Sequence, residues 1–511
     1  AALRAEGRIA GIAEREQEVP VSERGNNPTE ILLLKEWYVR QTHVQDRMRQ
    51  HIDSMDFVPC GNGNGKQALL NWMKNITIDW PISRRRWYHT EIPIWYVEGD
   101  ETKVIIPPAG TYVQPWREGP PGGSRVLDRA TRMDLGAYAS LATELGRPVG
   151  EEKVFDTWMD SSNSNLFVSG YAESLEGLGA GAADFNRAFP TGIRTQGKEI
   201  VRTWLYYTLL KSTLLLDRPG FRHVWIDGLG MDPWGHKMSK SSGNGIDADS
   251  VLECGAAGRP GMWKLRGPEG KLKQLKAQKI GSECFRLWKA CDAKVGEDFS
   301  IDPEQIEANY FGVLTKMFNI ARFASQFPVP EDLDTAPSAA LPAGDRWILA
   351  EFAALLQEVG TAYQAFDIFS ASRALKSFGT GLLSSHWLEL AKTRLYTGDV
   401  CSKWTLHRIL RDWLTLFSPV CPIFSHYLSE TLYHRSAVDI RALPRPALLG
   451  GAEAEAGRLR ALTKPLCEFN SHVWRAKQGA GLSLNEEIAG IHIPEIITEL
   501  SADLIAMHKL T

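Results

Sequence analysis

The sequence predicts an α/β region followed by an all-helical region, in a chain of 511 residues that has room for roughly three or four domains. A short apolar run at Arg222–Ile226 is typical of a buried strand, and apolar residues recur with helical spacing between Ile200 and Lys211. From Glu304 onward the pattern changes to long amphipathic helices. Strands and helices therefore mix in the first part and helices dominate the second.

The composition is that of a large enzyme without a global charge bias. The 58 Lys and Arg residues nearly balance 61 Asp and Glu residues, so RNA binding would have to use local patches. Seven cysteines lie scattered with no Cys-x-x-Cys pair, which argues against a zinc knuckle or a disulfide framework and suits a reducing compartment. No apolar run reaches membrane-spanning length, and neither a signal nor a transit peptide is supported. We expect a cytoplasmic protein, with an organelle matrix not excluded.

The beginning of the chain carries little chemical information. Residues 1–30 mix charge, Gly and Pro without a sustained period, which predicts an edge segment. Lys35–Arg40 alternates like a strand, and Gln45–Met55 has the pattern of a short helix. Gly61–Lys66 resembles a phosphate loop but lacks its full spacing and is followed by Gln67 instead of a hydroxyl residue. A flexible loop is therefore predicted there.

The stretch Asp232–Asn244 is the most informative part of the sequence. It follows the predicted strand Arg222–Ile226, so it would leave the carboxyl edge of a sheet, where α/β folds place their ligands. Lys237 and Lys240 lie among serine and glycine residues, and such a loop can bring two ammonium groups to a polyphosphate. A solvated basic turn is the alternative that composition alone would favour.

Lys237-Met-Ser-Lys-Ser241 resembles in full the second nucleotide-binding motif of class I aminoacyl-tRNA synthetases. The resemblance implies that Lys237 and Lys240 are catalytic and stabilise the pyrophosphate that leaves ATP. It implies that three further residues of the motif contact ATP, namely Met238, Ser239 and Ser241. ATP and Mg²⁺ are then the expected cofactors.

A second passage narrows the resemblance. Asp79–Trp87 is similar to the Trp-Cys-Ile-Ser-Arg-Gln-Arg passage of the valyl, isoleucyl and leucyl branch, with Pro81 in place of Cys or Val and Arg85 in place of Gln. Relatives often carry zinc cysteines after this passage. Because Val97–Pro120 contains no cysteine, we predict no metal there.

Asp156–Ser162 is similar to the Asp-x-Trp-x-Asp-Ser passage that borders the amino-acid pocket of the family. The resemblance implies that Trp158 forms a wall of that pocket, and that Asp160 with Ser161 orders its polar rim. An isolated aromatic residue is more simply explained as core. A flat indole discriminates only modestly between branched side chains, so a separate editing site is expected in the family.

Arg194–Glu199 precedes the helical pattern and resembles the Gly-x-Asp nucleotide contact of the family. A glycine at a helix start lets backbone amides approach a ligand, and a carboxylate one turn later can accept from ribose hydroxyls. Gly197 and Glu199 would be the ATP-binding residues. Glu in place of Asp adds a methylene that can misplace the carboxylate, and an acidic first turn that complements the helix dipole is the alternative.

The segment Gly255–Ile280 has no counterpart in the family pattern, which continues directly with Gly281–Trp288. It carries seven basic residues against the single acid Glu269. A solvated face is as plausible as our hypothesis that the segment contacts RNA phosphates. The residues of that hypothesis are Lys264, Arg266, Lys271, Lys273, Lys276 and Lys279, with Arg259 the seventh basic residue.

The second half of the chain reads as a helix bundle. Apolar stripes run through Ile348–Val359 and Leu406–Phe417, and the second ends at Ser418–Pro419. Ser418-Pro-Val-Cys-Pro422 and three other passages resemble the anticodon-binding bundle of valyl-tRNA synthetases, and the tail after Val473 resembles the archaeal type. Unpaired anticodon bases would be recognised there by stacking and edge hydrogen bonds.

The family's His-Ile-Gly-His motif is not in this sequence. The resemblance therefore implies an incomplete Rossmann-type catalytic domain, an all-α anticodon-binding bundle and a small C-terminal α+β domain. The expected boundaries are 1–30 for the trailing edge of an editing insertion, 31–300 for the catalytic part, 301–443 for the bundle, 444–457 for a linker and 458–511 for the terminal domain.

Three interpretations of function follow. In the first, the chain supplies one half of a valyl-tRNA synthetase that activates valine with ATP and transfers it to tRNA(Val), with the N-terminal half on a preceding segment or another chain. In the second, it is a degenerate relative that serves as an RNA-binding or scaffold component of a larger RNA–protein assembly. Pro81, Arg85 and Glu199 favour this alternative. Isoleucyl or leucyl specificity is the third, and the tail disfavours it.

Overall fold

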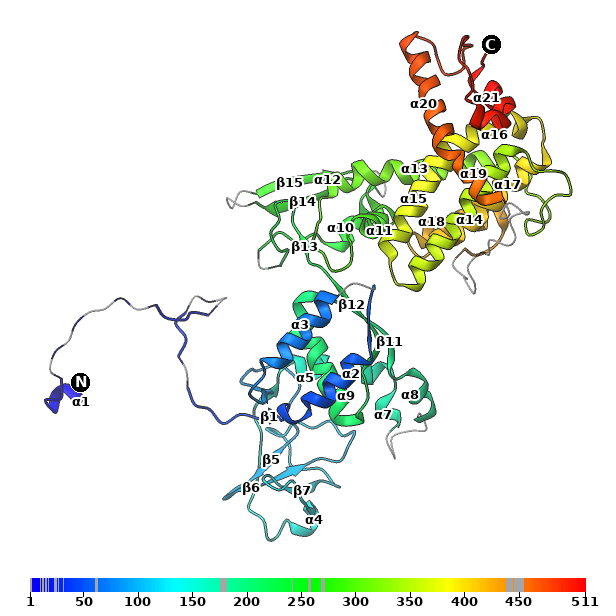
Figure 1. Ribbon diagram of the computed structural model, residues 1–511. Helices are drawn as coiled ribbons and strands as arrows, with labels where there is room; N and C mark the ends of the chain where they lie inside the picture. The colour runs from blue at the N-terminus through cyan, green and yellow to red at the C-terminus, as the bar shows by residue number, and fades with distance from the viewer. Residues whose placement is uncertain are drawn as a thin grey trace. The chain divides into compact units, whose positions relative to one another are not determined.

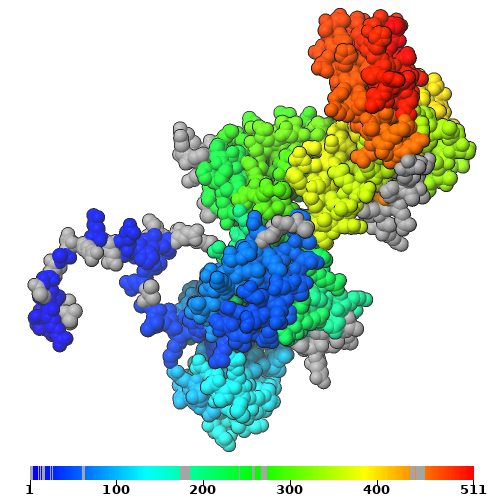
Figure 2. All heavy atoms as spheres, in the orientation of Figure 1, coloured from blue at the N-terminus to red at the C-terminus, as the bar shows by residue number. Residues whose placement is uncertain are grey.

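The protein is represented by a computed structural model (Figures 1 and 2). The structure describes residues 2–511 apart from 10, 12, 14, 15, 17, 23, 24, 26, 31, 60–62, 175–181, 241, 256–258, 268–271, 438–443 and 445–454. Two compact units divide the chain. The first comprises Ala1–His43 and Ile76–Ser161, and the second comprises Val44–Asn75 and Ser162–Thr511.

The first unit is built on a five-stranded antiparallel sheet with the order β8-β7-β6-β5-β9. Its strands are β5 (Trp95–Val97), β6 (Asp100–Ile106), β7 (Arg125–Asp128), β8 (Asp134–Ala137) and β9 (Pro148–Gly150). Alternate apolar residues of these strands enclose a small core around Trp95 and Ile105. The described residues before Glu36 are exposed except Ser22, wherever their burial is given. They begin with the short helix α1 (Ala2–Ala5), drawn at the N-terminus in Figure 1, and include a bridge between Val21 and Pro28.

The first unit also contains two short antiparallel strand pairs, which lie close in sequence to its predicted site residues. They are β1 (Tyr38–Val39) with β3 (Trp80–Pro81), and β4 (Ser83–Arg84) with β10 (Val154–Phe155). The strand predicted at Lys35–Arg40 is therefore shorter than the alternation suggested. Directly after β10, helix α5 (Thr157–Ser161) carries the predicted amino-acid pocket residues.

The second unit begins with a three-stranded parallel sheet of order β11-β12-β2 (Figure 1). The strands are β11 (Thr191–Gly197), β12 (Phe221–Asp227) and β2 (Asp56–Val58), and β12 contains the predicted strand Arg222–Ile226. Helices α2 (Gln45–Asp53), α3 (Gly63–Lys74) and α9 (Tyr206–Leu216) belong to the same unit; α2 packs against α9, and α3 packs against β2. This arrangement is the expected α/β fold.

The flexible loop predicted at Gly61–Lys66 is wrong over its described part. Gly63–Lys66 forms the first turn of α3, whereas residues 61 and 62 lie outside the described residues. A Cβ atom on Gly65 would lie 2.5 Å from Cδ1 of Ile226. The glycine therefore permits close packing of the helix on β12, and this tertiary contact outweighs the low helix propensity of glycine.

Beyond β12 the chain forms the lysine loop, by which we mean residues 232–244, and then an inserted hairpin. The loop begins after β13 (Gly230–Met231), which pairs in parallel with β16 (Phe299–Ser300). Helix α10 (Ala248–Glu253) follows, and the basic insertion folds into the antiparallel hairpin of β14 (Gly261–Arg266) and β15 (Leu272–Ala277). Helix α11 (Gly281–Asp292) leads on to the bundle.

The rest of the unit is a helix bundle, as the apolar stripes predicted (Figure 1). Its main helices are α12 (Pro303–Ile306), α13 (Gly312–Ala324), α14 (Ala343–Gln364), α15 (Ile368–Ser377), α16 (Leu388–Tyr396), α17 (Val400–Phe417) and α18 (Pro422–Tyr433), with π-helical turns η5 (Glu307–Phe311) and η6 (Phe378–Trp387). Helix α17 ends one residue before Ser418–Pro419, where the proline stops the stripe.

The C-terminal segment is helical, with a parallel bridge between Ile488 and Leu510. Its helices are α19 (Ala456–Ala461), α20 (Thr463–Gly479), η9 (Glu495–Leu500) and α21 (Ser501–His508). Of the predicted linker 444–457, residues 445–454 lie outside the described residues, and Ala456 and Gly457 already belong to α19. Figure 2 shows α20 and α21 (orange to red) packed as one mass of side chains.

Candidate functional site

The lysine loop is organised around a buried carboxylate. The side chain of Asp232 has no exposed surface, and its Oδ1 accepts hydrogen bonds from the backbone N–H groups of Trp234 (3.0 Å) and His236 (2.9 Å). Burial alone would raise the pKa of Asp232, but a hydrogen bond from the side chain of Asn244, the two backbone hydrogen bonds and the neighbouring His236 together lower it. The carboxylate is therefore ionised and fixes the first half of the loop.

Asn244 joins the far end of the loop to the same carboxylate. Its Nδ2 donates to Oδ2 of Asp232 (3.0 Å) and to the carbonyl of Lys237 (3.2 Å). Oδ1 of Asn244 accepts a hydrogen bond from the backbone N–H of Ser239 (2.9 Å). Asn244 is only 3% exposed. We call Asp232 and Asn244 the loop clamp, because together they hold both arms of the loop.

The clamp leaves the two predicted catalytic side chains in solvent. Lys237 and Lys240 are exposed, whereas Met238 and Ser239 are partly buried. The hydroxyl of Ser239 lies 2.7 Å from that of Ser242. Ser241 lies outside the described residues. The structure thus brings four of the five predicted motif residues together on one ordered turn, with both ammonium groups free to reach an anion.

Gly197 is the last residue of β11 and directly precedes the 3-10 turn η2 (Lys198–Ile200), which contains Glu199. The glycine therefore lies at a helix start, as predicted, but the strand before it was not predicted. A Cβ atom on Gly197 would lie 2.2 Å from Oε2 of Glu199, so the longer acidic side chain folds back over the glycine. A cavity of about 700 Å³ adjoins this edge, and its lining includes Gly197, Asp227 and Gly228. Ligands of open α/β sheets bind at this position.

Charged side chains connect this edge of the sheet with the segments that follow the loop. Nζ of Lys289 on α11 lies 2.7 Å from Oδ2 of Asp227 and stacks over Phe299. Nζ of Lys198 lies 2.7 Å from Oδ1 of Asp298. The two pairs link the ends of β11 and β12 to α11 and to the residue before β16, the strand that pairs with β13 just ahead of the lysine loop.

The predicted amino-acid pocket residues belong to the first unit. Trp158 and Asp160 are partly buried on α5 with Ser161, and Oδ2 of Asp160 accepts from the hydroxyl of Thr90 (2.8 Å) and lies 3.0 Å from Nδ1 of His89. Asp160 is therefore held in a polar cluster, consistent with a rim. Its role in binding an amino acid stays a prediction.

The departures from the family passage have structural partners in the same unit. Arg85, which stands in place of Gln, lies 3.0 Å from a carboxylate oxygen of Glu36, and Arg84 lies 2.6 Å from Asp156. Pro81 occupies strand β3 opposite Tyr38. These side chains stabilise the strand pairs locally, so the departures are accommodated by the fold.

Two polar side chains on β11 are buried without hydrogen-bond partners among the described residues. They are Arg194 (5% exposed), whose Nε and Nη2 are unpaired, and Gln196 (7% exposed), whose amide atoms are both unpaired. Burial lowers the pKa of Arg194 to about 9. The outer edge of β11 pairs with no strand that the structure describes. The guanidinium of Arg194 lies over the ring of Trp204, so it has an aromatic contact although its Nε and Nη2 make no hydrogen bond. Buried polar groups without hydrogen bonds are uncommon.

The basic insertion separates into two sets of lysines. Lys264 and Lys276 are exposed on the solvent face of the β14–β15 hairpin, whereas Lys273 lies over the ring of Trp234 and Lys279 lies over that of Phe311. Lys271 is outside the described residues, and the side chain of Arg266 is not described either. On the hairpin's other face Trp263, Leu265, Leu275 and Ala277 are buried, and Lys273 is the exposed charge among the described residues of that face.

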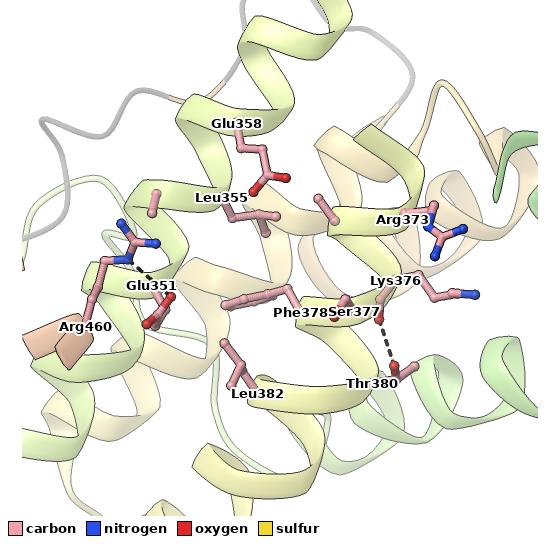
Figure 3. A pocket seen from close by; sticks show the side chains of 12 residues that line it. Glu351, Leu355, Glu358, Arg373, Lys376, Ser377, Phe378, Thr380, Leu382 and Arg460 are labelled. Atoms are coloured by element: carbon pink, nitrogen blue, oxygen red, sulfur yellow. Dashed lines mark hydrogen bonds and ion pairs between the residues drawn. The ribbon is translucent and has the colours of Figure 1, made fainter. Parts of the chain in front are cut away.

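A further cavity of about 610 Å³ lies in the helix bundle over α14, α15 and η6 (Figure 3). Arg373 and Lys376 flank one side of it, and Glu351 and Glu358 come from the opposite helix. Nε of Arg460 lies 3.4 Å from Glu351, so part of the charge is paired. No residue of this cavity was predicted as a site from the sequence.

In the part of the chain that is described, no group of three or more His, Cys, Asp or Glu residues could hold a metal ion. Burial raises the pKa of the thiols of Cys284, Cys291 and Cys421, which makes them unreactive. Among the described helices, none combines the length and apolarity needed to cross a membrane.

Sequence reasoning missed the loop clamp and the ion pairs of Lys198 and Lys289. Asp232 and Asn244 are the first and last residues of the stretch that was singled out, and Asp and Asn are the residues that most readily hydrogen-bond nearby backbone. That signal could have identified them. The ion pairs join segments about 60 to 100 residues apart, for which no local pattern exists.

Two family profiles match the chain. Residues 12–302 match the tRNA synthetases class I (I, L, M and V), and residues 345–489 match the anticodon-binding domain of tRNA ligase. The first match contains the lysine loop and the end of β11, and the second contains most of the bundle and α20.

Archaeal valine–tRNA ligases are similar over almost the whole chain. The enzyme of Pyrobaculum aerophilum is 32% identical over 506 residues, which is 96% of this chain and 55% of that protein. The enzyme of Nanoarchaeum equitans is 32% identical over 513 residues, covering 99% and 58%. The chain thus spans little more than half the length of these relatives. The methionyl-tRNA synthetase of Mycobacterium tuberculosis, solved with methionyl-adenylate, has a similar fold, with a TM-score of 0.51, 16% identity and coverage of 81% and 65%.

Proposed function

The chain belongs to the class I tRNA synthetases (I, L, M and V), and we propose that it supplies the lysine-loop half of a valine–tRNA ligase. The observation that carries the proposal is the ordered loop at Lys237–Ser239, which follows the carboxyl end of a parallel strand and presents two solvated lysines. A loop of this kind fits a polyphosphate better than a protein partner. Its two lysines lie among residues with small side chains, so a phosphate group can approach the backbone closely.

The proposed reaction is attack of the valine carboxylate on the α-phosphate of ATP. Lys237 and Lys240 stabilise the negative charge that builds up on the departing pyrophosphate. Met238, Ser239 and Ser241 contact the nucleotide in this proposal. At the end of β11, the backbone of Gly197 would approach the nucleotide, and the carboxylate of Glu199 would accept from its ribose hydroxyls. Mg²⁺ would be held chiefly by the phosphates and water, as is usual for this ion.

In this proposal Trp158 forms a wall of the valine pocket, with Asp160 and Ser161 at its rim. The cluster of Asp160 with Thr90 and His89 supports a fixed orientation of that rim. Valine is chosen over isoleucine and leucine because the similar archaeal proteins are valine–tRNA ligases. The helical region that matches the anticodon-binding profile would bind tRNA(Val).

We further propose that an N-terminal half of the synthetase completes the site at β11. Parallel sheets are normally covered on both faces and extended beyond three strands. The open edge of β11 supports a partner strand there, because its backbone groups pair with no strand that the structure describes. The half that carries the family's His-Ile-Gly-His motif, on a preceding segment or on another chain, fits this position.

RNA contact by the hairpin remains our hypothesis for the basic insertion. The exposed ammonium groups of Lys264 and Lys276 stand diagonally across the two strands, on one face, and such a pair can contact adjacent phosphates. Lys273 and Lys279 lie over aromatic rings, so they are less free to contribute. The scaffold interpretation gains no support from the family matches.

The test is amino-acid-dependent exchange between ATP and pyrophosphate, measured with and without the N-terminal half. We expect exchange with valine when both halves are present, and much less with isoleucine or leucine. Exchange that prefers another amino acid would contradict the valine assignment. No exchange under any condition, with tRNA binding retained, would contradict the enzyme and select the scaffold alternative.

A further inference from the structure

The composition of the lysine loop predicts a mobile segment, yet several backbone groups of its described residues are hydrogen-bonded to the buried side chains of Asp232 and Asn244. Between Asp232 and Asn244 the sequence contains two glycines and three serines, which add conformational freedom. Five hydrogen bonds of the loop clamp oppose that freedom. Both clamp residues are buried, so water cannot replace these bonds.

The clamp acts on the backbone atoms closest to the lysines. Asn244 Nδ2 holds the carbonyl of Lys237 itself, and Asn244 Oδ1 holds the N–H of Ser239, the residue before Lys240. The segment from Lys237 to Ser239 is thereby fixed at two points, while the side chains beyond it stay free. Fixing backbone without immobilising the ammonium groups sets where their charge can act.

We propose that Asp232 and Asn244 are positioning residues for the reaction, which hold the backbone of Lys237 and Ser239 so that both ammonium groups meet the same departing anion. The inference rests on the proposed function. Neither clamp residue touches the substrate. The clamp transmits its effect through the loop backbone to Lys237 and Lys240.

The side-chain chemistry at position 244 explains why an amide is required. Asn244 must donate to a carboxylate and a carbonyl and also accept from an N–H, which only an amide can do there. Asn244→Ala removes all three bonds. Asn244→Asp places a second carboxylate about 3 Å from Asp232, so one of the two must hold a proton before the bond can form.

The first measurement is amide hydrogen exchange of the full chain, which does not depend on activity. In Asn244→Ala we expect the amides of Ser239 and its neighbours to exchange about tenfold faster or more than in the wild type. Asp249→Asn is the matched control, because it removes an exposed carboxylate just beyond the loop. Equal exchange in the wild type and in Asn244→Ala would overturn the clamp.

The second measurement is valine-dependent pyrophosphate exchange by the chain with its N-terminal half. Asn244→Ala should lower kcat about tenfold or more with the KM for valine unchanged, because the clamp acts only on charge that develops in the transition state. Asn244→Asp should recover as the pH is lowered from about 8 to about 6, unlike Asn244→Ala and the wild type. An unchanged kcat, or a rise in KM alone, would overturn the positioning role.

The two measurements separate the inference from the proposed function. If the wild type showed no valine-dependent exchange, the proposed function and the positioning role would both fail. Faster amide exchange in Asn244→Ala would then still establish the clamp as a structural device.

Discussion

Arg394 provides the sharpest test of how the C-terminal segment is held to the bundle. This guanidinium on α16 lies 3.0 Å from Oδ1 of Asp345 on α14 and 2.9 Å from Oδ1 of Asp503 on α21. It also donates to the hydroxyl of Ser402. The substitution Arg394→Met keeps most of the side-chain volume and removes the charge, so it isolates the ion pairs from packing.

The expected cost follows from the burial of Asp345, whose side chain has no exposed surface. Removing one partner of such a pair leaves a buried charge and costs about 3–5 kcal/mol. Burial already raises the pKa of Asp345, and without Arg394 to oppose it the pKa rises further. The folded variant therefore retains a proton that the unfolded chain releases, so its deficit grows as the pH increases above the ordinary pKa of Asp.

The loss in free energy of unfolding would be measured by urea unfolding at about pH 5 and about pH 8, with amide hydrogen exchange of α21 as the probe. We expect Arg394→Met to lose several kcal/mol at the higher pH and less at the lower one, with α21 released first. Lys392→Met on the same helix is the control, because its pair with Glu389 is half exposed and is worth about 0.5 kcal/mol at most. A loss under about 1 kcal/mol for Arg394→Met, or the same loss at both pH values, would refute the reasoning.

Three further predictions follow from the same structure. Burial lowers the pKa of His508 to about 4, against about 6.5 in the unfolded chain. The free energy of unfolding should therefore fall by up to about 3 kcal/mol as the pH drops from about 6.5 to about 4. His508→Gln should make the dependence of the urea midpoint on pH less steep. Gly228→Ala should cost about 2 kcal/mol or more in thermal unfolding, because its Cβ would lie 1.8 Å from the carbonyl oxygen of Glu297; a neutral effect would show that this approach is not rigid. Replacing Lys264 and Lys276 together with Gln should reduce the slope of log Kd for tRNA against log salt by about 2, and an unchanged slope would exclude the hairpin from the RNA interface.

The parts of the fold that follow a local period could be predicted from the sequence. The strand expected at Arg222–Ile226 is β12, Gln45–Met55 contains α2, and the stripe that ends at Ser418–Pro419 is α17. In each case the buried face repeats within the element, so one segment carries the whole signal.

The rest depends on contacts that no single segment encodes. Gly63–Lys66 forms a helix because Gly65 packs on β12, and glycine-rich composition gave the opposite expectation. The basic insertion forms a hairpin in which buried apolar side chains, such as Trp263 and Leu265, alternate with charged ones. A count of the charges in this segment does not reveal their alternation with apolar residues. Tertiary packing outweighs local propensity in both places.

The sequence singled out the stretch that forms the lysine loop but not the side chains that hold its backbone. The loop follows the predicted strand Arg222–Ile226, as its motif implies, whereas strand β11, which ends at Gly197, was not predicted. The roles of the loop lysines and of Gly197 stay predictions. The clamp was missed although Asp232 and Asn244 bound the motif on both sides. A search for the reactive groups of a site should therefore include the residues that fix their backbone.

In the proposed function, the flexible ammonium groups of Lys237 and Lys240 stabilise the departing pyrophosphate. This role is tested most directly by valine-dependent pyrophosphate exchange of Lys237→Met and Lys240→Met, each with the N-terminal half present. We expect each variant to lose kcat by on the order of 100-fold while tRNA binding is unchanged. Exchange at more than half the wild-type rate in both variants would contradict this role.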